Sequence, residues 1–334
     1  MNQSEKRPRA SRILGIGGYL PENVVDNHYF EKIVDTSDSW IRERSGIIQR
    51  HFAAPDQLNS DMSAIAGRKA IEDAGLTPED IDLIILATCT PDRPIPATSV
   101  VVQDKIGAVN AACFDINAAC SGFIYGLICA NAMIVAEQCK HVLLIGTELL
   151  SRVIDMTDRT TCVLFGDGSG AVVLGPSYDS RGLLGHTMGS DGSLRDLITI
   201  PCGGTELPPT PERLAEHLQY VHMKGNETYK HAVTRLAESS VKALENAKIK
   251  ADDLDLVIPH QANTRILQSV AKRLGINYDE KFFINLPHVG NTSAASIPIA
   301  INEAREIGRI KPGTLMLLVA FGGGLTFGGA VLRY

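Results

Sequence analysis

The sequence predicts an α/β fold made of two similarly built halves, and three observations lead to this prediction. Short apolar runs alternate with helical patterns along the chain, which is the order of elements expected in layered α/β folds. The length of 334 residues suggests two domains at ~150 residues per domain. Finally, a stretch of the first half has a close counterpart in the second half.

Five apolar runs are predicted to be strands, and several are apolar at consecutive residues, which is typical of parallel strands covered on both faces. They are residues 13–15, 83–87, 142–145, 257–258 and 315–319. Helical patterns lie between them, for example over 62–74 and 232–247. The longest apolar runs, such as 315–321, are far shorter than the ~20 residues that span a bilayer, so we expect no membrane contact.

Two pairs of segments suggest an internal duplication. Residues 70–88 (AIEDAGLTPEDIDLIILAT) resemble 243–261 (ALENAKIKADDLDLVIPHQ) at an offset of 173, and 142–147 (VLLIGT) resemble 316–321 (MLLVAF) at an offset of 174. Chance likeness of two αβ units is the simpler alternative, but two pairs at nearly one offset favour duplication. We therefore predict halves of 1–176 and 177–334, with 176–230, rich in Gly, Pro and Thr, as an insertion or flap.

Composition excludes several classes of protein. A content of 44% hydrophobic and 21% charged residues is that of a globular protein, not a disordered one. The net charge of −6 argues against a nucleic-acid binder. Seven cysteines, an odd number with no Cys-x-x-Cys pair, argue against a disulfide scaffold or a cysteine-bound zinc. The polar N-terminus precedes no long apolar run, so we expect no secretory signal and a cytoplasmic location.

Cys120 is the first candidate for chemistry. It follows a strand-like run and a turn of small residues, 117–119, and it precedes an apolar helix pattern. A thiol at a helix N-terminus lies near the positive end of the helix dipole, which favours the thiolate. The alternative is a small buried core residue, but the small neighbours would let a substrate approach the sulfur.

Two polar residues in the second half are further candidates. His260 ends a predicted strand, at the edge where α/β sheets place their ligands, although a hydrogen-bonded strand end is the simpler interpretation. Asn291 precedes a small-residue helix over about 293–304, where an N-cap is the simpler interpretation. The 173-residue offset maps Cys120 to Ser293, so the Cys120 and Asn291 loops are expected to face one another.

Glycines follow the last long apolar run. Gly322, Gly323 and Gly324 come directly after it, where they could direct a backbone N–H at a reacting oxygen or form a plain turn. A dinucleotide fingerprint at 14–18 is rejected because Leu20 occupies the third glycine position and Pro21 follows.

These residues belong to seven motifs that together resemble the β-ketoacyl-acyl carrier protein synthase III family of thiolase-like condensing enzymes, over about residues 13–334. The motifs are TSDSWIRERSGI (36–47), NAACSGF (117–123), TDRTT (157–161), FGDGSGA (165–171), PHQAN (259–263), GNTSAAS (290–296) and AFGGG (320–324). The resemblance implies a duplicated thiolase-like fold in five αβαβα layers. It also implies a Cys-His-Asn triad of Cys120, His260 and Asn291, with Asn291 where elongating relatives use a second histidine. Plant-type polyketide synthases share this triad but typically carry GFGPG near the C-terminus.

The resemblance further implies a reaction. The Cys120 thiolate attacks an acyl-CoA and releases CoA, while the backbone N–H groups of Cys120 and Gly323 hold the oxyanion. Malonyl-acyl carrier protein then enters and loses carbon dioxide, and the carbanion attacks the acyl-cysteine. A neutral His260 and Asn291 donate hydrogen bonds to the malonyl thioester oxygen. No metal or bound redox cofactor is implied.

Binding residues are also implied by the resemblance. CoA contacts are expected from the residues of the first motif, of TDRTT and of PHQAN, with the adenine stacked on Trp40 and Arg159; ordinary burial of the only tryptophan is the alternative. The CoA set is Thr36, Trp40, Arg44, Arg159 and Asn263. The carrier-protein set is Lys230, Arg265, Lys272 and Arg273, a basic patch suited to an acidic partner or merely a solvated face.

The acyl pocket is expected at Phe321 and Ile95. By resemblance, Ile95 closes the pocket of a partner subunit, so a homodimer is expected. Family members often place Phe at this position, so Ile95 leaves the length and branching of the primer open. Two other functions remain open: a condensing enzyme of secondary metabolism, and a noncatalytic acyl- or carrier-binding protein, against which the intact Cys120, His260 and Asn291 argue.

Overall fold

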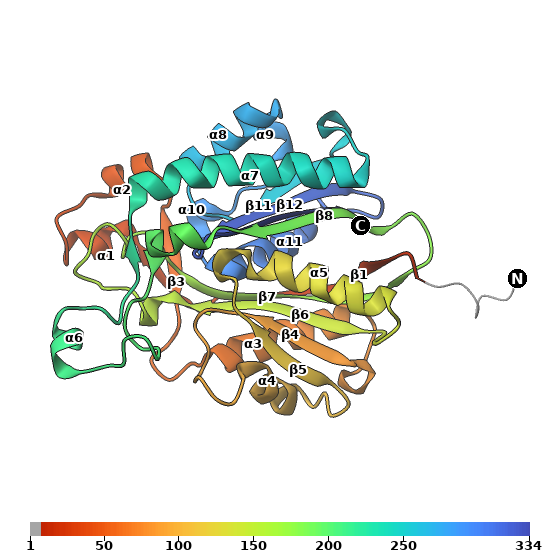
Figure 1. Cartoon of the computed structure of the whole chain (residues 1–334), viewed down its shortest axis with the longest axis horizontal. Helices are drawn as coiled ribbons and strands as arrows, with labels where there is room; N and C mark the ends of the chain where they lie inside the picture. The colour runs from red at the N-terminus through yellow and green to blue at the C-terminus, as the bar shows by residue number, and fades with distance from the viewer. Residues whose placement is uncertain (1–7) are drawn as a thin grey trace, which may run out of the picture.

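Two mixed β-sheets are stacked with helices outside and between them in the computed structural model, which describes residues 8–334 (Figure 1). The first sheet has the strand order β1 (Ala10–Tyr19), β7 (Asp167–Ser177), β6 (Val142–Leu149), β4 (Leu83–Ala87), β5 (Ala112–Ile116). The second has the order β11 (Leu256–Pro259), β12 (Leu315–Gly322), β13 (Thr326–Arg333), β8 (Gly182–Ser190).

The helices form three layers around these sheets. Helices α3 (Asn59–Asp73) and α4 (Thr98–Ile106) cover the outer face of the first sheet, and α7 (Gly225–Ala247) covers the outer face of the second, with α8 (Thr264–Leu274) beside it. Helices α5 (Gly122–Val135) and α11 (Ser296–Glu306) lie between the sheets and contact both. The predicted α/β fold in five αβαβα layers is thereby confirmed.

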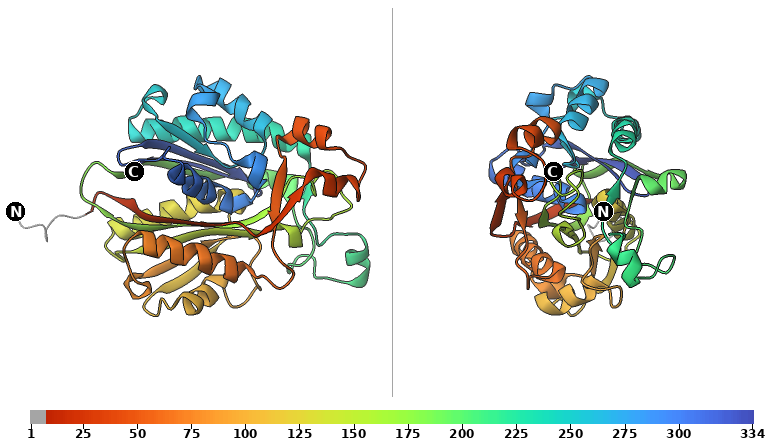
Figure 2. Two further views of the ribbon diagram at one scale, coloured as in Figure 1. Left: turned by 180° about the vertical axis from the view of Figure 1, so that it is seen from behind. Right: turned by 90° about the vertical axis from the view of Figure 1, so that its left-hand side faces the viewer.

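Shorter elements gather at one end of the layers, where α5 also begins (Figures 1 and 2). They include α1 (Asn27–Glu31), α2 (Asp38–Ser45), α6 (Pro211–Ala215) and the ribbon of β2 (Asn23–Asp26) and β3 (Gln49–Phe52). A second ribbon joins β9 (Ile198–Thr199) to β10 (His222–Met223), and α9 (Tyr278–Lys281) and α10 (Leu286–Val289) follow α8. The long loops of the chain thus surround one end of the sheets.

The five predicted strands are present, but their directions are mixed. Strands β4, β5 and β6 run parallel, as do β11 and β12. Strand β1, however, pairs antiparallel with β7, and β7 also runs antiparallel to β6. The parallel direction expected for several of the apolar runs is confirmed for β4, β6, β11 and β12, whereas β1 is antiparallel because burial on both faces does not determine the direction of a strand.

The internal likeness corresponds to matching elements. Leu83 of β4 pairs with Val142 of β6, and Leu256 of β11 pairs with Met316 of β12, so the offset is 173 from β4 to β11 and 174 from β6 to β12. The first sheet takes all its strands from residues up to 177, and the second from residue 182 onward. The division into domains 1–176 and 177–334 itself stays a prediction. The expectation of an insertion or flap over 176–230 was partly wrong, because residues 182–190 form β8, an outer strand of the second sheet.

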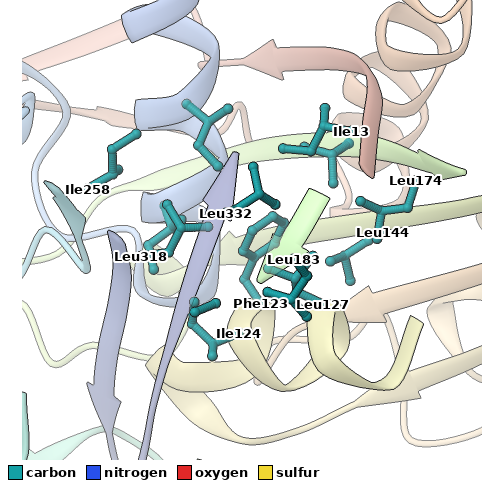
Figure 3. Close-up of a cluster of buried hydrophobic side chains, with 14 of the residues drawn as sticks. Ile13, Phe123, Ile124, Leu127, Leu144, Leu174, Leu183, Ile258, Leu318 and Leu332 are labelled. Atoms are coloured by element: carbon teal, nitrogen blue, oxygen red, sulfur yellow. The ribbon is translucent and has the colours of Figure 1, made fainter. Parts of the chain in front are cut away.

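The main hydrophobic core lies between the sheets (Figure 3). Phe123, Ile124 and Leu127 of α5 pack there with residues of both sheets, among them Leu144 and Leu318. Helix α5 is apolar around most of its circumference because it is a middle layer with a sheet on each side. Within residues 8–334, no helix combines the length and apolar character needed to cross a bilayer.

Candidate active site

Cys120 lies in a tight turn at the entrance to α5. A 3₁₀ turn over Ala119–Ser121 precedes the helix, and Ala119 adopts a left-handed backbone with φ of +46°. The start of β13 holds this turn: Thr326 Oγ1 donates to the Ala118 carbonyl at 2.7 Å, and Ser121 Oγ donates to the Thr326 carbonyl at 3.1 Å. The start of β13 therefore fixes the position of the turn that carries the thiol.

The predicted glycine run lies against this turn. A Cβ at Gly322 would come within 2.6 Å of the Cys120 backbone nitrogen and 3.1 Å of its Cβ, so only glycine fits there. A Cβ at Gly323 would come within 3.7 Å of the Ala119 Cβ. The close approach agrees with an oxyanion site near Cys120, but Gly322 is the glycine in closest contact with Cys120, a feature that the sequence does not show.

The surroundings of Cys120 do not favour a free thiolate. Burial raises the pKa of the Cys120 thiol to about 11, the hydrogen bond with Ser293 lowers it, and the Glu148 carboxylate raises it further. The helix N-terminus alone suggested a stabilised thiolate. The structure differs because the protein around this partly accessible thiol desolvates it, which penalises the charged form.

Glu148 is a buried carboxylate that sequence reasoning missed. It is fully buried at the end of β6 and accepts hydrogen bonds from Thr90 Oγ1 at 2.6 Å and Ser293 Oγ at 3.1 Å. The backbone N–H and thiol of Cys89 also donate to it. Burial raises the pKa of Glu148, and these hydrogen bonds oppose the rise. An acidic residue inside the apolar run VLLIGTEL was the signal available in the sequence.

His260 directly follows β11 and is only 2% exposed. Its backbone N–H donates to the Val319 carbonyl at 2.8 Å, which fixes the main chain. Its Nδ1 lies 2.7 Å from Ser296 Oγ. Burial lowers the pKa of His260 to about 4, so the ring is neutral at neutral pH, as expected.

Asn291 is held by its main chain and by one end of its side chain. Its backbone N–H donates to the Leu164 carbonyl at 3.0 Å, and its carbonyl accepts from Gly166 N–H at 2.9 Å. Its Oδ1 accepts from Ser293 N–H at 2.9 Å. The Nδ2 group has no hydrogen-bond partner within the described part of the chain, so it remains available as a donor.

The three predicted residues converge on a contact between two 3₁₀ turns. The Cys120 turn packs against the turn Ser293–Ala295. Asn291 lies just before that second turn, and Ser296, the partner of His260, follows it. The expectation that the two loops face one another agrees with this contact.

The residue-by-residue mapping between the halves is shifted by one. Ala119 and Ser293 have the same left-handed backbone, with φ of +46° and +48°. Ser293 is therefore the counterpart of Ala119, and Cys120 corresponds to Ala294. The predicted match of Cys120 with Ser293 was wrong because the offset at these turns is 174, as it is between β6 and β12, and not the 173 found between β4 and β11.

The expected CoA residues lie at the end of the molecule that carries α2. The half-buried ring of Trp40 has Arg159 at 5.1 Å and Arg44 at 5.9 Å from its centroid. Thr36 Oγ1 is buried without a hydrogen-bond partner in the described structure. Asn263 joins α8 to α2, because Oδ1 caps Arg265 N–H at 2.9 Å and Nδ2 donates to the Arg44 carbonyl at 2.8 Å. Both polar atoms of the Asn263 amide are thus engaged in hydrogen bonds within the protein.

The four expected carrier-protein residues are exposed on α7 and α8. Tyr229 Oη lies 2.8 Å from Ser269 Oγ, which brings the beginning of α7, with Lys230, to α8. The patch consists of Lys230, Arg265, Lys272 and Arg273, and none of the four forms an ion pair with a described residue. Arg273 donates to Thr234 Oγ1 at 3.1 Å, so this side chain lies toward α7.

The two expected acyl-pocket residues occupy different environments. Phe321 is 5% exposed on β12, one residue before Gly322. Ile95 is 86% exposed in the loop between β4 and α4. A single chain therefore leaves Ile95 without a covering partner. Across residues 8–334, no three His, Cys, Asp or Glu side chains gather in a way that could hold a metal ion.

Comparisons with known proteins show which families and relatives the chain is similar to. The family described as "3-Oxoacyl-[acyl-carrier-protein (ACP)] synthase III C terminal" matches residues 244–334, and "3-Oxoacyl-[acyl-carrier-protein (ACP)] synthase III" matches residues 114–192. The curated relatives include the β-ketoacyl-acyl-carrier-protein synthase III of Roseiflexus sp. (strain RS-1), 50% identical over 320 residues, which are 96% of this chain and 97% of the relative. That of Clostridioides difficile (strain 630) is 49% identical over 322 residues, covering 96% and 98%.

Solved structures agree with these relatives. The 3-oxoacyl-acyl-carrier-protein synthase III of Aquifex aeolicus VF5 has a TM-score of 0.90 and 45% identity, over 97% of this chain and 100% of that chain. A priming β-ketosynthase from the R1128 polyketide biosynthetic pathway has a TM-score of 0.91 and 33% identity, over 98% and 97%.

Proposed function

The chain belongs to the β-ketoacyl-acyl carrier protein synthase III family, and from this premise we propose that Cys120, His260 and Asn291 form its reacting centre. The protein is a condensing acyltransferase that initiates fatty acid synthesis. The observation that carries the assignment of residues is the orientation of the two donors: Nδ1 of His260 and Oδ1 of Asn291 are each bound to the protein. That leaves Nε2 and Nδ2 for the substrate.

In the first half-reaction, Cys120 Sγ attacks the thioester carbon of an acyl-CoA. The new carbon–sulfur bond replaces the bond to CoA, and the proton of the thiol leaves with the CoA sulfur, so the exchange is balanced. A resting thiol with a pKa of about 11 requires this proton to leave as the attack proceeds. Backbone N–H groups of Cys120 and Gly323 are the proposed donors to the oxyanion.

In the second half-reaction, malonyl-acyl carrier protein loses carbon dioxide and its α-carbon attacks the acyl-cysteine. The electron pair of the broken carbon–carbon bond passes into an enolate, whose oxygen accepts hydrogen bonds from His260 Nε2–H and Asn291 Nδ2–H. A neutral ring is needed for a hydrogen bond of this kind without proton transfer, and burial lowers the pKa of His260 to about 4. The carbanion forms the new bond to the acyl carbon, the Cys120 sulfur leaves as a thiolate, and the thiolate takes a proton from solvent.

We assign binding of the CoA adenine to Trp40 with Arg159 and Arg44. A guanidinium beside an indole ring offers a flat, positively charged place for an aromatic base and its phosphates. Thr36 adds a buried hydroxyl with no partner within the described residues. Asn263 acts mainly by joining α8 to α2.

The carrier protein is proposed to bind to the patch of Lys230, Arg265, Lys272 and Arg273. These cations are exposed and have no ion-pair partner in the described chain, so no neighbouring carboxylate offsets their positive charge. Such a surface attracts an acidic protein over a distance of about 10 Å at moderate salt.

A homodimer is proposed to complete the acyl pocket. Strand β5 is the outer strand of its sheet, and an unpaired edge can extend its sheet with another chain. Phe114 of β5 and Ile95 are both exposed apolar side chains, and pairing of two chains would bury such surface. Ile95 would then limit the partner's pocket beside Phe321.

The primer is best determined by mass spectrometry with acetyl-, isobutyryl- and longer acyl-CoA. We expect an acyl adduct on Cys120 that is absent in Cys120→Ser, and condensation when malonyl-carrier protein is added. Failure of every acyl-CoA to label Cys120 would contradict the proposal. Condensation only with an acyl donor or acceptor other than short or branched acyl-CoA and malonyl-carrier protein would favour the alternative role in secondary metabolism, which the likeness to the polyketide priming enzyme also allows.

A further inference from the structure

We propose that Ser296 sets the protonation site of His260: its hydroxyl donates to Nδ1, which keeps the ring proton on Nε2. Ser296 is the first residue of α11 and is 1% exposed. Its Oγ lies 2.7 Å from His260 Nδ1, and both side chains are buried. The inference rests on the proposed function for its consequence in catalysis, but the hydrogen bond itself is independent of it.

The direction of this hydrogen bond follows from the neighbouring donor. The backbone N–H of Gln261 donates to the same Ser296 Oγ at 3.3 Å. If Nδ1–H also donated to Oγ, the hydroxyl would accept twice and its own proton would have no acceptor, because Ser296 makes no other side-chain hydrogen bond in the described structure. If Oγ–H donates to Nδ1, all three groups are satisfied, and buried polar groups are nearly always satisfied.

The protonation site matters because the neutral imidazole carries one proton. With Nδ1 as acceptor, Nε2 carries that proton and can donate to the enolate oxygen. In the other tautomer, Nε2 presents a lone pair to the developing negative charge, which would repel it. Ser296 is therefore a positioning residue that acts through His260 and does not itself touch the substrate.

A purely structural role for Ser296 as a helix start does not account for its contacts. The residue preceding α11 is Ala295, which provides no side-chain cap. The Ser296 hydroxyl bonds to no backbone group of its own helix. Its two partners are His260 and the N–H of Gln261, so the hydroxyl serves the loop after β11.

The test is ¹⁵N NMR of the ring nitrogens in the full-length protein labelled with ¹⁵N-histidine, with His260→Ala to identify the resonances. We expect the Nε2–H tautomer in the native protein, a mixture of tautomers in Ser296→Ala, and a return to Nε2–H in Ser296→Thr, which keeps the hydroxyl. The matched control is Ser240→Ala, which removes a buried hydroxyl bound to the Leu236 carbonyl at 2.7 Å on α7; its His260 signals should not change.

Kinetics separates this inference from the proposed function. Ser296→Ala should lower the rate of decarboxylation of malonyl-carrier protein on the order of tenfold and leave acylation of Cys120 nearly unchanged. The loss is smaller than that caused by a substitution that forces a catalytic histidine into the wrong tautomer, because the variant keeps a mixture of tautomers. An Nδ1–H tautomer in the native protein, or an unaltered tautomer in Ser296→Ala, would overturn the inference, and the native spectrum decides even if the variant fails to fold. A tautomer that shifts without any loss of decarboxylation would support the role of Ser296 and overturn the donor role of His260.

Discussion

The side chains of His260 and Asn291, at the centre of the site, are held in the same way. His260 and Asn291 each have two polar atoms, and in each the atom bound to the protein determines what the other atom can do. The backbone N–H of Ser293 donates a hydrogen bond, and in the Asn291 amide only the oxygen Oδ1 can accept it. The amide therefore cannot be reversed, and its Nδ2 must point elsewhere. Such fixed donors stabilise a developing charge without reorganising during the reaction.

Asn291→Asp tests this arrangement with little change of shape. The carboxylate still accepts from Ser293 N–H, but the donor Nδ2 is lost and a negative charge faces the enolate. We expect decarboxylation of malonyl-carrier protein to fall by about 10²–10³-fold, the usual effect of removing one such donor, with a smaller effect on the acyl adduct at Cys120 by mass spectrometry. Equal loss in the two half-reactions would contradict the assigned role.

The buried ring of His260 also makes stability depend on pH. Burial lowers the pKa from 6.5 to about 4 in the folded protein, so between these values the unfolded chain binds more protons than the folded one. Stability therefore falls as the pH drops from about 6.5 toward about 4, by about 3 kcal/mol for this group.

Urea unfolding at pH 7 and pH 4.5 measures this dependence. Because carboxylates also titrate in this range, the informative quantity is the difference between the native protein and His260→Gln. The loss of unfolding free energy on acidification should be smaller in the variant, and an identical loss in the two proteins would show that His260 is not a buried neutral histidine.

At the scale of elements, the sequence predicted those strands whose apolar runs are uninterrupted. Strands β4 and β6 and their counterparts β11 and β12 were found because each is apolar over most of its length. Strand β13 was not, since TFGGAVLR contains two glycines that bring the strand close to α7 and β8. A glycine pattern in a strand reflects close packing against distant segments, which a single sequence does not reveal.

The same limit applies to the site. The motifs around Cys120, His260 and Asn291 indicated which residues to examine, but the contact between Ser296 and His260 joins residues that are 36 positions apart. Likewise, Glu148 contacts Ser293 from 145 positions away. Contacts of this kind arise only when helices and strands that are distant in the sequence pack together, so neither periodicity nor a local motif could predict them.

Helices α7 and α8 present the charge on which the carrier-protein proposal depends. Arg265→Glu reverses one charge at the beginning of α8 without removing a buried group. We expect a higher KM for malonyl-carrier protein, by about five- to tenfold at low salt, with nearly unchanged acylation by acyl-CoA. The matched control is Lys140→Glu, an exposed reversal in the loop after α5, which should leave both unchanged. An Arg265→Glu enzyme with an unaltered KM for the carrier would rule out this part of the patch.

At the scale of the whole molecule, the two sequence halves are joined through the site itself. Asn291 of the second half pairs with the backbone of Leu164 and Gly166 in the first. Thr326 of the second half holds the Cys120 turn of the first. Helix α5 buries Phe123 and Ile124 in the core shared by both sheets. Neither half therefore contains its own complete core or site.

Separate production of 1–176 and 177–334 tests this dependence. We expect that 1–176 alone does not form an acyl adduct on Cys120, because α5 would expose the apolar face that normally meets the second sheet and the Cys120 turn would lose Thr326. The control is the intact chain with a Gly-Ser linker inserted between Asp179 and Ser180, in the exposed loop that joins β7 to β8. Insertions at exposed loop tips are generally tolerated, so this chain should still be acylated. The adduct requires a folded, accessible Cys120 and an oxyanion site that we place partly at Gly323 in the second half. Acylation of isolated 1–176 by acyl-CoA, detected by mass spectrometry, would therefore mean that the first half is an autonomous module.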